Sequence, residues 1–330
     1  MTIDEIVYLL DLEEQTAQVH VYQKDDDPTC TEIVIQSRIS YGQKEYTVTS
    51  IDARAFAGAK YIKSIEIPAT ITEIGENAFG SCSALTGITL PNGIKSIENT
   101  MFSGCKSLEE IEIPNMVESI GVAAFLGCSK LKKIVIPNGV TMLGDNCFQE
   151  CSSLEEVVLP DNITTLPYAS FVLCKNLKKI TLPSNLTQID SSVFSSCEAL
   201  EEITLPNGLK FIGRSAFSGC DTLTEMVIPE SVEEVDVNVV YGCENLKRIF
   251  YPSHLKDAFV SAEYNDLAKF SYIINPDGTV SIKVEHLPEG MTEISLPRDI
   301  GGRQIVSITG PQGVNLPVSC TKHYTKTYTK

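Results

Sequence analysis

Apolar side chains recur through the middle of this 330-residue chain at a fixed spacing of 23 residues. A typical copy begins at Phe79 and reads FGSCSALTGITLPNGIKSIENTM, after which Phe102 opens the next copy. No insertion or deletion interrupts the spacing, so the copies are predicted to be equivalent structural units. Phenylalanine opens the first eight copies and valine opens a partial ninth: Phe56, Phe79, Phe102, Phe125, Phe148, Phe171, Phe194, Phe217 and Val240.

The order of aliphatic residues within one copy predicts a short strand, a turn and a second wall. In the copy that begins at Phe79, Ile88 and Leu90 alternate inward along the strand. Pro91 follows and ends the strand, because proline has no N–H to donate to a neighbouring strand. Ile94 and Ile97 then fill the opposite wall. Glycines near the end of four copies are expected to permit a bend into a short helical or 3₁₀ turn: Gly75, Gly121, Gly144 and Gly213.

A fixed period of about 20 to 29 residues with an L-x-x-I-x-L core is typical of a leucine-rich repeat solenoid. One copy cannot bury its own apolar side chains, but stacked copies form a continuous core. The predicted fold class is therefore a right-handed, β-rich α/β superhelix of 23-residue repeats with β-rich caps. We expect a curved array with a parallel sheet on its concave side.

The pattern F-x-x-C-x-x-L-x-x-I-x-[IL]-P-x-x-[IV]-x-x-I-G-x-x-x-F resembles the BspA-like leucine-rich repeats and covers residues 48–252. Such repeats occur in bacterial surface proteins and in surface-protein families of parasitic protists. The resemblance implies a non-enzymatic adhesin or host-interaction protein, located at the cell surface or outside the cell. It assigns no site residues. The chain departs from the family pattern where Glu98, Pro167, Asp190 and Asp236 replace the glycine.

The repeats are flanked by segments without the 23-residue period. Residues 1–51 are predicted to form an N-terminal β cap, with a hairpin formed by alternating apolar residues on either side of Glu13 and a further strand at 33–35. The repeat array spans 52–252. Residues 253–270 have apolar residues at near-helical spacing. This spacing predicts an amphipathic helix that caps the end of the array or links it to the next segment. Residues 271–330 are predicted to form a small β module with a basic tail.

The β module resembles the N-terminal cap in its order of elements. A hairpin is predicted around Pro276-Asp277-Gly278. Further along, Val306-Ser307-Ile308 matches Thr49-Ser50-Ile51, the residues that precede the first repeat. Residues 271–309 therefore look like a second cap that is not followed by an array.

Outward-facing positions of the predicted strands offer the candidate binding surface. One column carries mostly β-branched residues, and we call it the strip: Val135, Val158, Thr181, Thr204, Val227 and Phe250. A second column alternates in charge, and we call it the charge ladder: Lys133, Glu156, Lys179 and Glu202. Adjacent strands lie about 4.8 Å apart, so opposite charges become cross-strand neighbours. The ladder is interpreted first as a way to avoid stacking like charges and second as a recognition surface. The strip is interpreted as β propensity or as a protein contact surface.

Composition narrows the possible partners. The formal net charge is −17, which argues against nucleic acid and anionic membranes, because both require a basic surface. No run of 18 apolar residues exists, so membrane insertion is not expected. The expected partner is a protein, either a host protein or an extracellular-matrix protein. The N-terminus lacks the pattern of a secretory signal. The alternative is therefore a cytoplasmic scaffold that binds a basic protein. Nothing in the pattern predicts an oligomeric state.

No residue pattern points to catalysis, a cofactor or a metal. Four histidines lie outside the repeats, and none stands in a recognised catalytic motif: His20, His254, His286 and His323. Eight of the eleven cysteines occupy one slot in successive repeats, a slot that Ala59 fills in the first copy. A straight row of parallel side chains cannot enclose a zinc ion, so these cysteines are expected to pack as small apolar groups.

Overall fold

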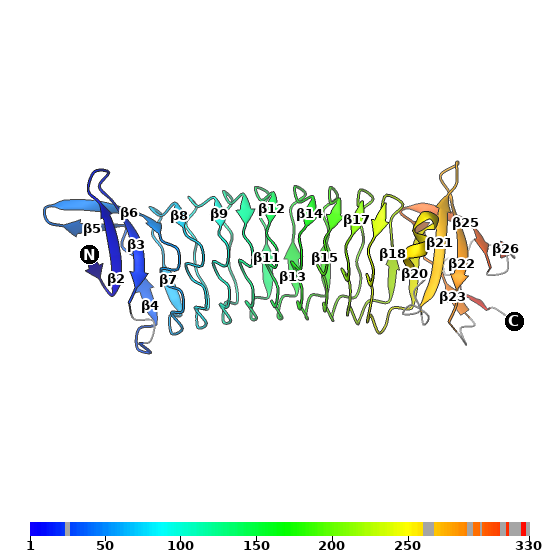
Figure 1. The fold of residues 1–330 in the computed structure, drawn as a ribbon, viewed down its shortest axis with the longest axis horizontal. Coiled ribbons are helices and arrows are strands. Elements are labelled where there is room, and N and C mark those ends of the chain that lie inside the picture. Colours follow the sequence, from blue (N-terminus) through cyan, green and yellow to red (C-terminus); the bar gives the residue numbers. More distant parts are fainter. Residues whose placement is uncertain are drawn as a thin grey trace.

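The computed structural model describes residues 1–23, 27–259, 267–288, 293–297, 299–310, 315–316 and 325–327. Between the two terminal modules, the chain forms a coil of successive turns, and each turn is one 23-residue repeat (Figure 1). The fold is a leucine-rich repeat solenoid, as predicted.

The coil has two walls, and most of its turns contribute a short parallel strand to each wall. On the sheet side the strands carry the predicted inward aliphatic residues, and the central strands pair in the order β11-β13-β15. The sheet-side strands are β7 (Ser64–Glu66), β11 (Lys133–Val135), β13 (Glu156–Val158), β15 (Lys179–Thr181), β18 (Glu225–Val227) and β20 (Arg248–Pro252). The opposite side carries β8 (Glu73–Ile74), β9 (Ser96–Ile97), β10 (Ser119–Ile120), β12 (Met142–Leu143), β14 (Thr165–Leu166), β16 (Gln188–Ile189), β17 (Phe211–Ile212) and β19 (Glu234–Val235).

The array is straight in Figure 1, whereas we expected curvature and a concave side. Curvature requires that one wall of the coil be wider than the other. Here both walls are extended segments of two or three residues, so adjacent turns are spaced alike on both sides. The array also contains turns where we expected short helices, and the described part of the chain from 52 to 252 has no helix.

The phenylalanines that open the repeats form a continuous stack in the core. Ring centroids of successive phenylalanines from Phe56 to Phe217 lie 5.3 to 5.7 Å apart, with nearly parallel planes. Tyr22 of the N-terminal cap continues the stack at 5.8 Å from Phe56. All eight phenylalanine rings are fully buried, so they supply much of the apolar area that holds neighbouring turns together.

Residues 1–51 carry six strands, β1 to β6, which we call the N-terminal cap. Its hairpin is formed by β2 and β3, and β6 pairs in parallel with β3. The cap then passes into the array, because β6 pairs with β8 and β4 pairs with β7. The strands of the cap are β1 (Thr2–Ile3), β2 (Ile6–Asp11), β3 (Thr16–Tyr22), β4 (Glu32–Val34), β5 (Arg38–Tyr41) and β6 (Lys44–Ile51).

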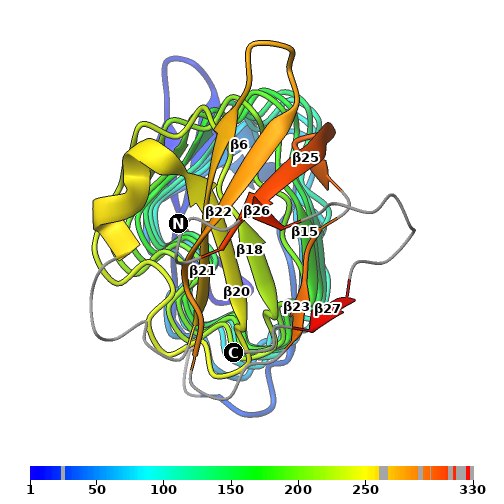
Figure 2. The same cartoon turned by 90° about the vertical axis from the view of Figure 1, so that its right-hand side faces the viewer.

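The C-terminal end differs in part from the prediction. A 3₁₀ helix, η1 (Ser253–Phe259), replaces the first half of the expected amphipathic helix and buries Leu255 and Phe259. Residues 260–266 lie outside the described residues, and Ala268–Phe270 is strand rather than helix because it pairs in parallel with β20. The strands of this end are β21 (Ala268–Ile274), β22 (Val280–His286), β23 (Glu293–Ser295), β24 (Asp299–Ile300), β25 (Arg303–Thr309), β26 (Asn315–Leu316) and β27 (Thr325–Thr327). Figure 2 shows β20, β21 and β22 lying across the end of the coil.

The glycines expected to permit a bend serve instead to let neighbouring turns approach. A Cβ atom added to Gly144 would lie 2.4 Å from the backbone nitrogen of Val122 in the preceding turn. Gly144 also donates a backbone hydrogen bond of 2.7 Å to Ile120. The close contact is therefore with backbone, which cannot move aside without breaking this bond.

Gly144→Ala is expected to lower the free energy of unfolding by about 3 kcal/mol, since the added methyl group overlaps backbone. The matched control is Gly87→Ala, because a Cβ atom at Gly87 meets nothing within 4 Å. The control should change stability by less than about 1 kcal/mol. Urea denaturation of both variants measures the difference, and equal stabilities would contradict the packing role.

Candidate functional site

The charge ladder is held in place by the parallel pairing of the sheet-side strands. Lys133 lies opposite Glu156, and Glu156 lies opposite Lys179 on the next strand. The Nζ atom of Lys133 is 2.9 Å from Oε1 of Glu156, and Nζ of Lys179 is 2.8 Å from Oε1 of Glu202. The predicted cross-strand neighbours therefore form ion pairs.

The neighbouring column repeats this alternation. Lys132 pairs with Glu109 at 3.8 Å, and Lys178 pairs with Glu155 at 3.6 Å. Hydrogen bonding to Glu202 raises the pKa of Lys179, and the same contact lowers the pKa of Glu202. The side chains of these pairs are exposed, and exposed pairs contribute little to stability. Their arrangement instead fixes a pattern of charge along the sheet side.

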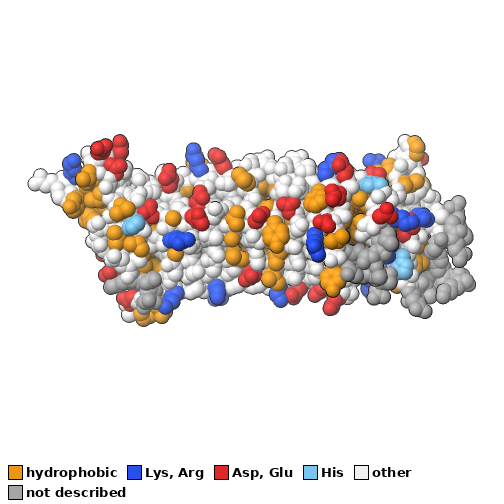
Figure 3. Space-filling view, viewed as in Figure 1, with side chains coloured by type: hydrophobic (Ala, Val, Ile, Leu, Met, Phe, Trp, Pro, Cys, Tyr) orange, Lys and Arg blue, Asp and Glu red, His pale blue; other side chains and the backbone are white. Residues whose placement is uncertain are grey.

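Beside the ladder, the central part of the strip faces solvent. Val135 is 50% exposed and Val158 is 41% exposed, high fractions for aliphatic side chains in a sheet. Thr181 and Thr204 continue the column and are also exposed, whereas Val227 is only half-exposed. Figure 3 shows a different face, the side that carries η1 in Figure 1, where hydrophobic side chains also gather in groups over the middle of the array with acidic residues between them.

Phe250 was expected to be part of this exposed strip, and that expectation is wrong. Its side chain is fully buried in a second apolar cluster, and its ring stacks on Phe270 at 4.7 Å. The cause is the pairing of β20 with β21, which continues the sheet beyond the last repeat. The C-terminal module then covers the outer face of this part of the sheet.

The cysteine ladder makes hydrogen bonds that the sequence did not reveal. In each case a thiol donates to the carbonyl of the phenylalanine 26 residues earlier, for example Cys151 to Phe125 at 3.2 Å. The same bond is made by Cys82, Cys105, Cys128, Cys174, Cys197, Cys220 and Cys243. Burial raises the pKa of Cys82 to about 12, so the thiol stays protonated at neutral pH. A protonated thiol is neither a nucleophile nor a metal ligand.

The histidines in the described part of the chain make simple polar contacts. Nδ1 of His20 lies 2.8 Å from Oδ2 of Asp52, which also accepts a hydrogen bond from Gln18. Nε2 of His254 lies 2.8 Å from the carbonyl oxygen of Val232. Within the described residues, no group of three His, Cys, Asp or Glu side chains is placed to hold a metal ion.

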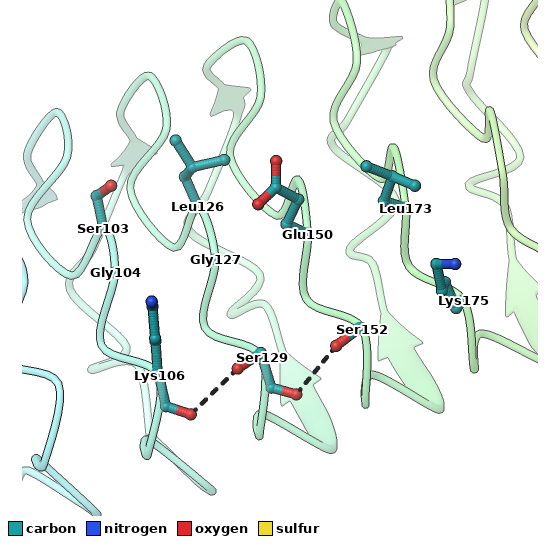
Figure 4. Close-up of a pocket in the computed structure, with 10 residues that line it drawn as sticks. All are labelled: Ser103, Gly104, Lys106, Leu126, Gly127, Ser129, Glu150, Ser152, Leu173 and Lys175. Atoms are coloured by element: carbon teal, nitrogen blue, oxygen red, sulfur yellow. Dashed lines mark hydrogen bonds between the residues drawn. The ribbon is translucent and has the colours of Figure 1, made fainter.

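A shallow groove of about 470 Å³, not predicted from the sequence, crosses the turns on the array surface (Figure 4). It opens where Gly104 and Gly127 leave space between side chains, and both have positive φ angles. The floor carries hydroxyl ladders in which Ser129 donates to the carbonyl of Lys106, and Ser152 to that of Ser129. Repeated glycines at one slot were the available signal for it.

No described helix is both long enough and apolar enough to cross a membrane.

The sequence matches the family model for the BspA type leucine-rich repeat region, in six copies over residues 37–155 and 141–266. Among solved structures, a leucine-rich repeat protein from Bacteroides ovatus is 38% identical and has a TM-score of 0.73. That match covers 82% of this chain and 66% of the Bacteroides protein. The T. pallidum leucine-rich repeat protein is 27% identical with a TM-score of 0.54, over 61% of this chain and 90% of that protein. No curated protein matches the chain.

Proposed function

Because the chain belongs to the BspA-type leucine-rich repeat family, we propose that it is a non-enzymatic, protein-binding solenoid that binds its partner on the sheet side. Leucine-rich repeat proteins generally bind other proteins. The observation that carries the proposal is the exposed centre of the strip, from Val135 to Thr204, next to the paired charges of the ladder. An apolar stripe rimmed by charges is typical of a protein contact surface.

The partner we propose is a host or extracellular-matrix protein, with the chain acting as an adhesin at the cell surface. The BspA-like resemblance of the repeats supports this setting. A second candidate is an intracellular scaffold, which the net charge of −17 favours because that charge attracts a basic protein. The two candidates share the binding surface and differ in the location of the protein.

Val158→Glu combined with Thr181→Glu is expected to abolish partner capture. The two carboxylates interrupt the strip, and removing them from water in an interface costs free energy. Both side chains are exposed, so thermal unfolding should shift little. The measurement is capture of proteins from native surroundings by immobilised wild type and variant. The matched control is Met142→Glu with Thr165→Glu on strands β12 and β14, which should retain capture. Capture that survives in the strip variant would exclude the sheet side as the binding surface.

Brief protease treatment of intact native cells distinguishes the adhesin from the scaffold. If the protein lies at the cell surface, peptides from residues 52–252 should be released while cytoplasmic marker proteins stay intact. Mass spectrometry of the supernatant identifies the peptides. Repeat peptides that appear only after lysis would exclude the adhesin and leave the scaffold.

A further inference from the structure

The two ends of the molecule share one pattern of strand pairing. At the N-terminal end β2 pairs antiparallel with β3, β3 pairs parallel with β6, and β5 pairs antiparallel with β6. At the C-terminal end β21 pairs antiparallel with β22, β22 pairs parallel with β25, and β24 pairs antiparallel with β25. The order and the directions are the same in both modules.

The correspondence extends to the register of single residues. In the N-terminal module Ala17 lies opposite Val48, the register then shifts, and Val19 lies opposite Ile51. In the C-terminal module Val280 lies opposite Ile305, the register shifts at the same point, and Ile282 lies opposite Ile308. Equivalent positions in the two modules are buried apolar residues, the pairs being Tyr8 and Tyr272, Ala17 and Val280, Val19 and Ile282, Ile39 and Ile300, Val48 and Ile305, and Ile51 and Ile308.

Each module has one edge that faces the preceding part of the chain. In the C-terminal module this edge belongs to β21, which pairs with β20 of the last repeat, so that Phe250 lies opposite Phe270. In the N-terminal module the equivalent edge belongs to β2 and is covered by β1, where Ile3 lies opposite Ile6. The same edge thus accepts either a repeat or a short antiparallel strand.

At the edges that face the following part of the chain, the N-terminal module pairs with a repeat and the C-terminal module pairs with short antiparallel strands. In the N-terminal module β4 pairs with β7 and β6 pairs with β8, both in parallel, so the first repeat occupies both edges. In the C-terminal module β23 pairs with β27 and β25 pairs with β26, both antiparallel. Leu316 lies opposite Ile308 just as Ile74 lies opposite its equivalent Ile51.

We propose that residues 268–309 form an array-starting cap, and that the edges of β23 and β25 are the docking site for the first turn of a second 23-residue leucine-rich repeat array joined after Ile308. The N-terminal module shows how such a turn binds, through parallel pairing at both edges and an apolar core that continues from the cap. β26 and β27 occupy the places that this first turn would take. The proposal rests on the pairing of the two modules and is independent of the partner proposed for the sheet side.

In the test protein, residues 1–308 are followed directly by a second copy of residues 52–330, which replaces residues 309–330. The junction is placed there because Ile308 is equivalent to Ile51. The second array is expected to fold onto the module and lengthen the molecule by about 4.8 Å per added turn in small-angle scattering. Amides of its first turn, residues 56–79, should exchange with solvent at least about 100-fold more slowly than in a variant with a flexible Gly-Ser segment inserted after Ile308.

A second fusion keeps the outcome decisive. It carries the same added array preceded by its own N-terminal cap, residues 1–51, and shows that the added array can fold in this position. Slow exchange in the direct fusion and in the capped fusion, with fast exchange in the Gly-Ser variant, supports the proposal. Fast exchange or unfolding of the added array in the direct fusion, while the capped fusion is protected, overturns it. Equal protection with and without the Gly-Ser segment overturns it as well.

Discussion

Phe148→Ala is expected to lower the free energy of unfolding by about 3 to 5 kcal/mol, the usual cost of removing a fully buried ring. The ring of Phe148 is fully buried and stacks on Phe125 at 5.4 Å and on Phe171 at 5.5 Å. Its loss leaves a cavity at the junction of two turns, where neither neighbour can close the gap without leaving its own stack. Urea denaturation followed by circular dichroism measures the change.

The control for this prediction is Leu12→Ala, since the side chain of Leu12 is 59% exposed. The control should change stability by less than about 0.5 kcal/mol. A loss below 1 kcal/mol for Phe148→Ala would mean that the stack adds little to the cohesion of the array.

The repeat and its inward side chains could be predicted from the sequence because they depend on neighbouring copies of the same pattern. A 23-residue period places Lys133 beside Glu156 wherever equivalent strands pair in register, and the structure has that register. The same argument placed the cysteines in the core. It did not reveal their hydrogen bonds to phenylalanine carbonyls, because the direction of a thiol depends on the turn that carries it.

The turn itself was the weakest part of the prediction. Each turn has two residues with positive φ, and at several of these positions the residue is not glycine, as at Asn146 and Leu173. Positive φ is rare for leucine, so no single residue signals this backbone. The one hint is that the position of Leu173 carries glycine or serine in most other turns, as at Gly127 and Ser196. A helical turn was therefore expected where the chain forms turns with two residues in the left-handed region of backbone conformation.

Phe250 shows where local periodicity stops being a guide. Its place in the repeat equals that of Val158, yet Val158 is exposed and Phe250 is buried. The difference arises from β21 and the rest of the C-terminal module, which lie outside the period and pair with the last strand. The extent of the candidate binding surface thus depends on a contact that the repeat pattern does not contain.

The buried cysteines predict a steep loss of stability at alkaline pH. Burial raises the pKa of eight thiols in the folded protein: Cys82, Cys105, Cys128, Cys147, Cys151, Cys174, Cys197 and Cys220 (for Cys220 a hydrogen bond to Cys243 is the larger cause). In the unfolded chain the same thiols ionise near pH 9. Below that pH both states hold the proton, so stability is unaffected. Above it only the unfolded state ionises, and stability falls until the pH reaches the folded pKa values, about 12 for Cys82 and Cys147.

Each thiol contributes about 1.4 kcal/mol per pH unit above pH 9, so the eight together lower the free energy of unfolding by on the order of 10 kcal/mol per pH unit. The protein is therefore expected to unfold between about pH 9.5 and 10.5, a transition that circular dichroism can follow during alkaline titration. Cys128→Ala, Cys151→Ala and Cys174→Ala combined should make this transition shallower, because three of the ionising groups are gone. Alanine is a suitable replacement, since Ala59 occupies the same slot in the first repeat and is fully buried there. An alkaline transition of unchanged steepness in the triple variant would show that the buried thiols do not control it.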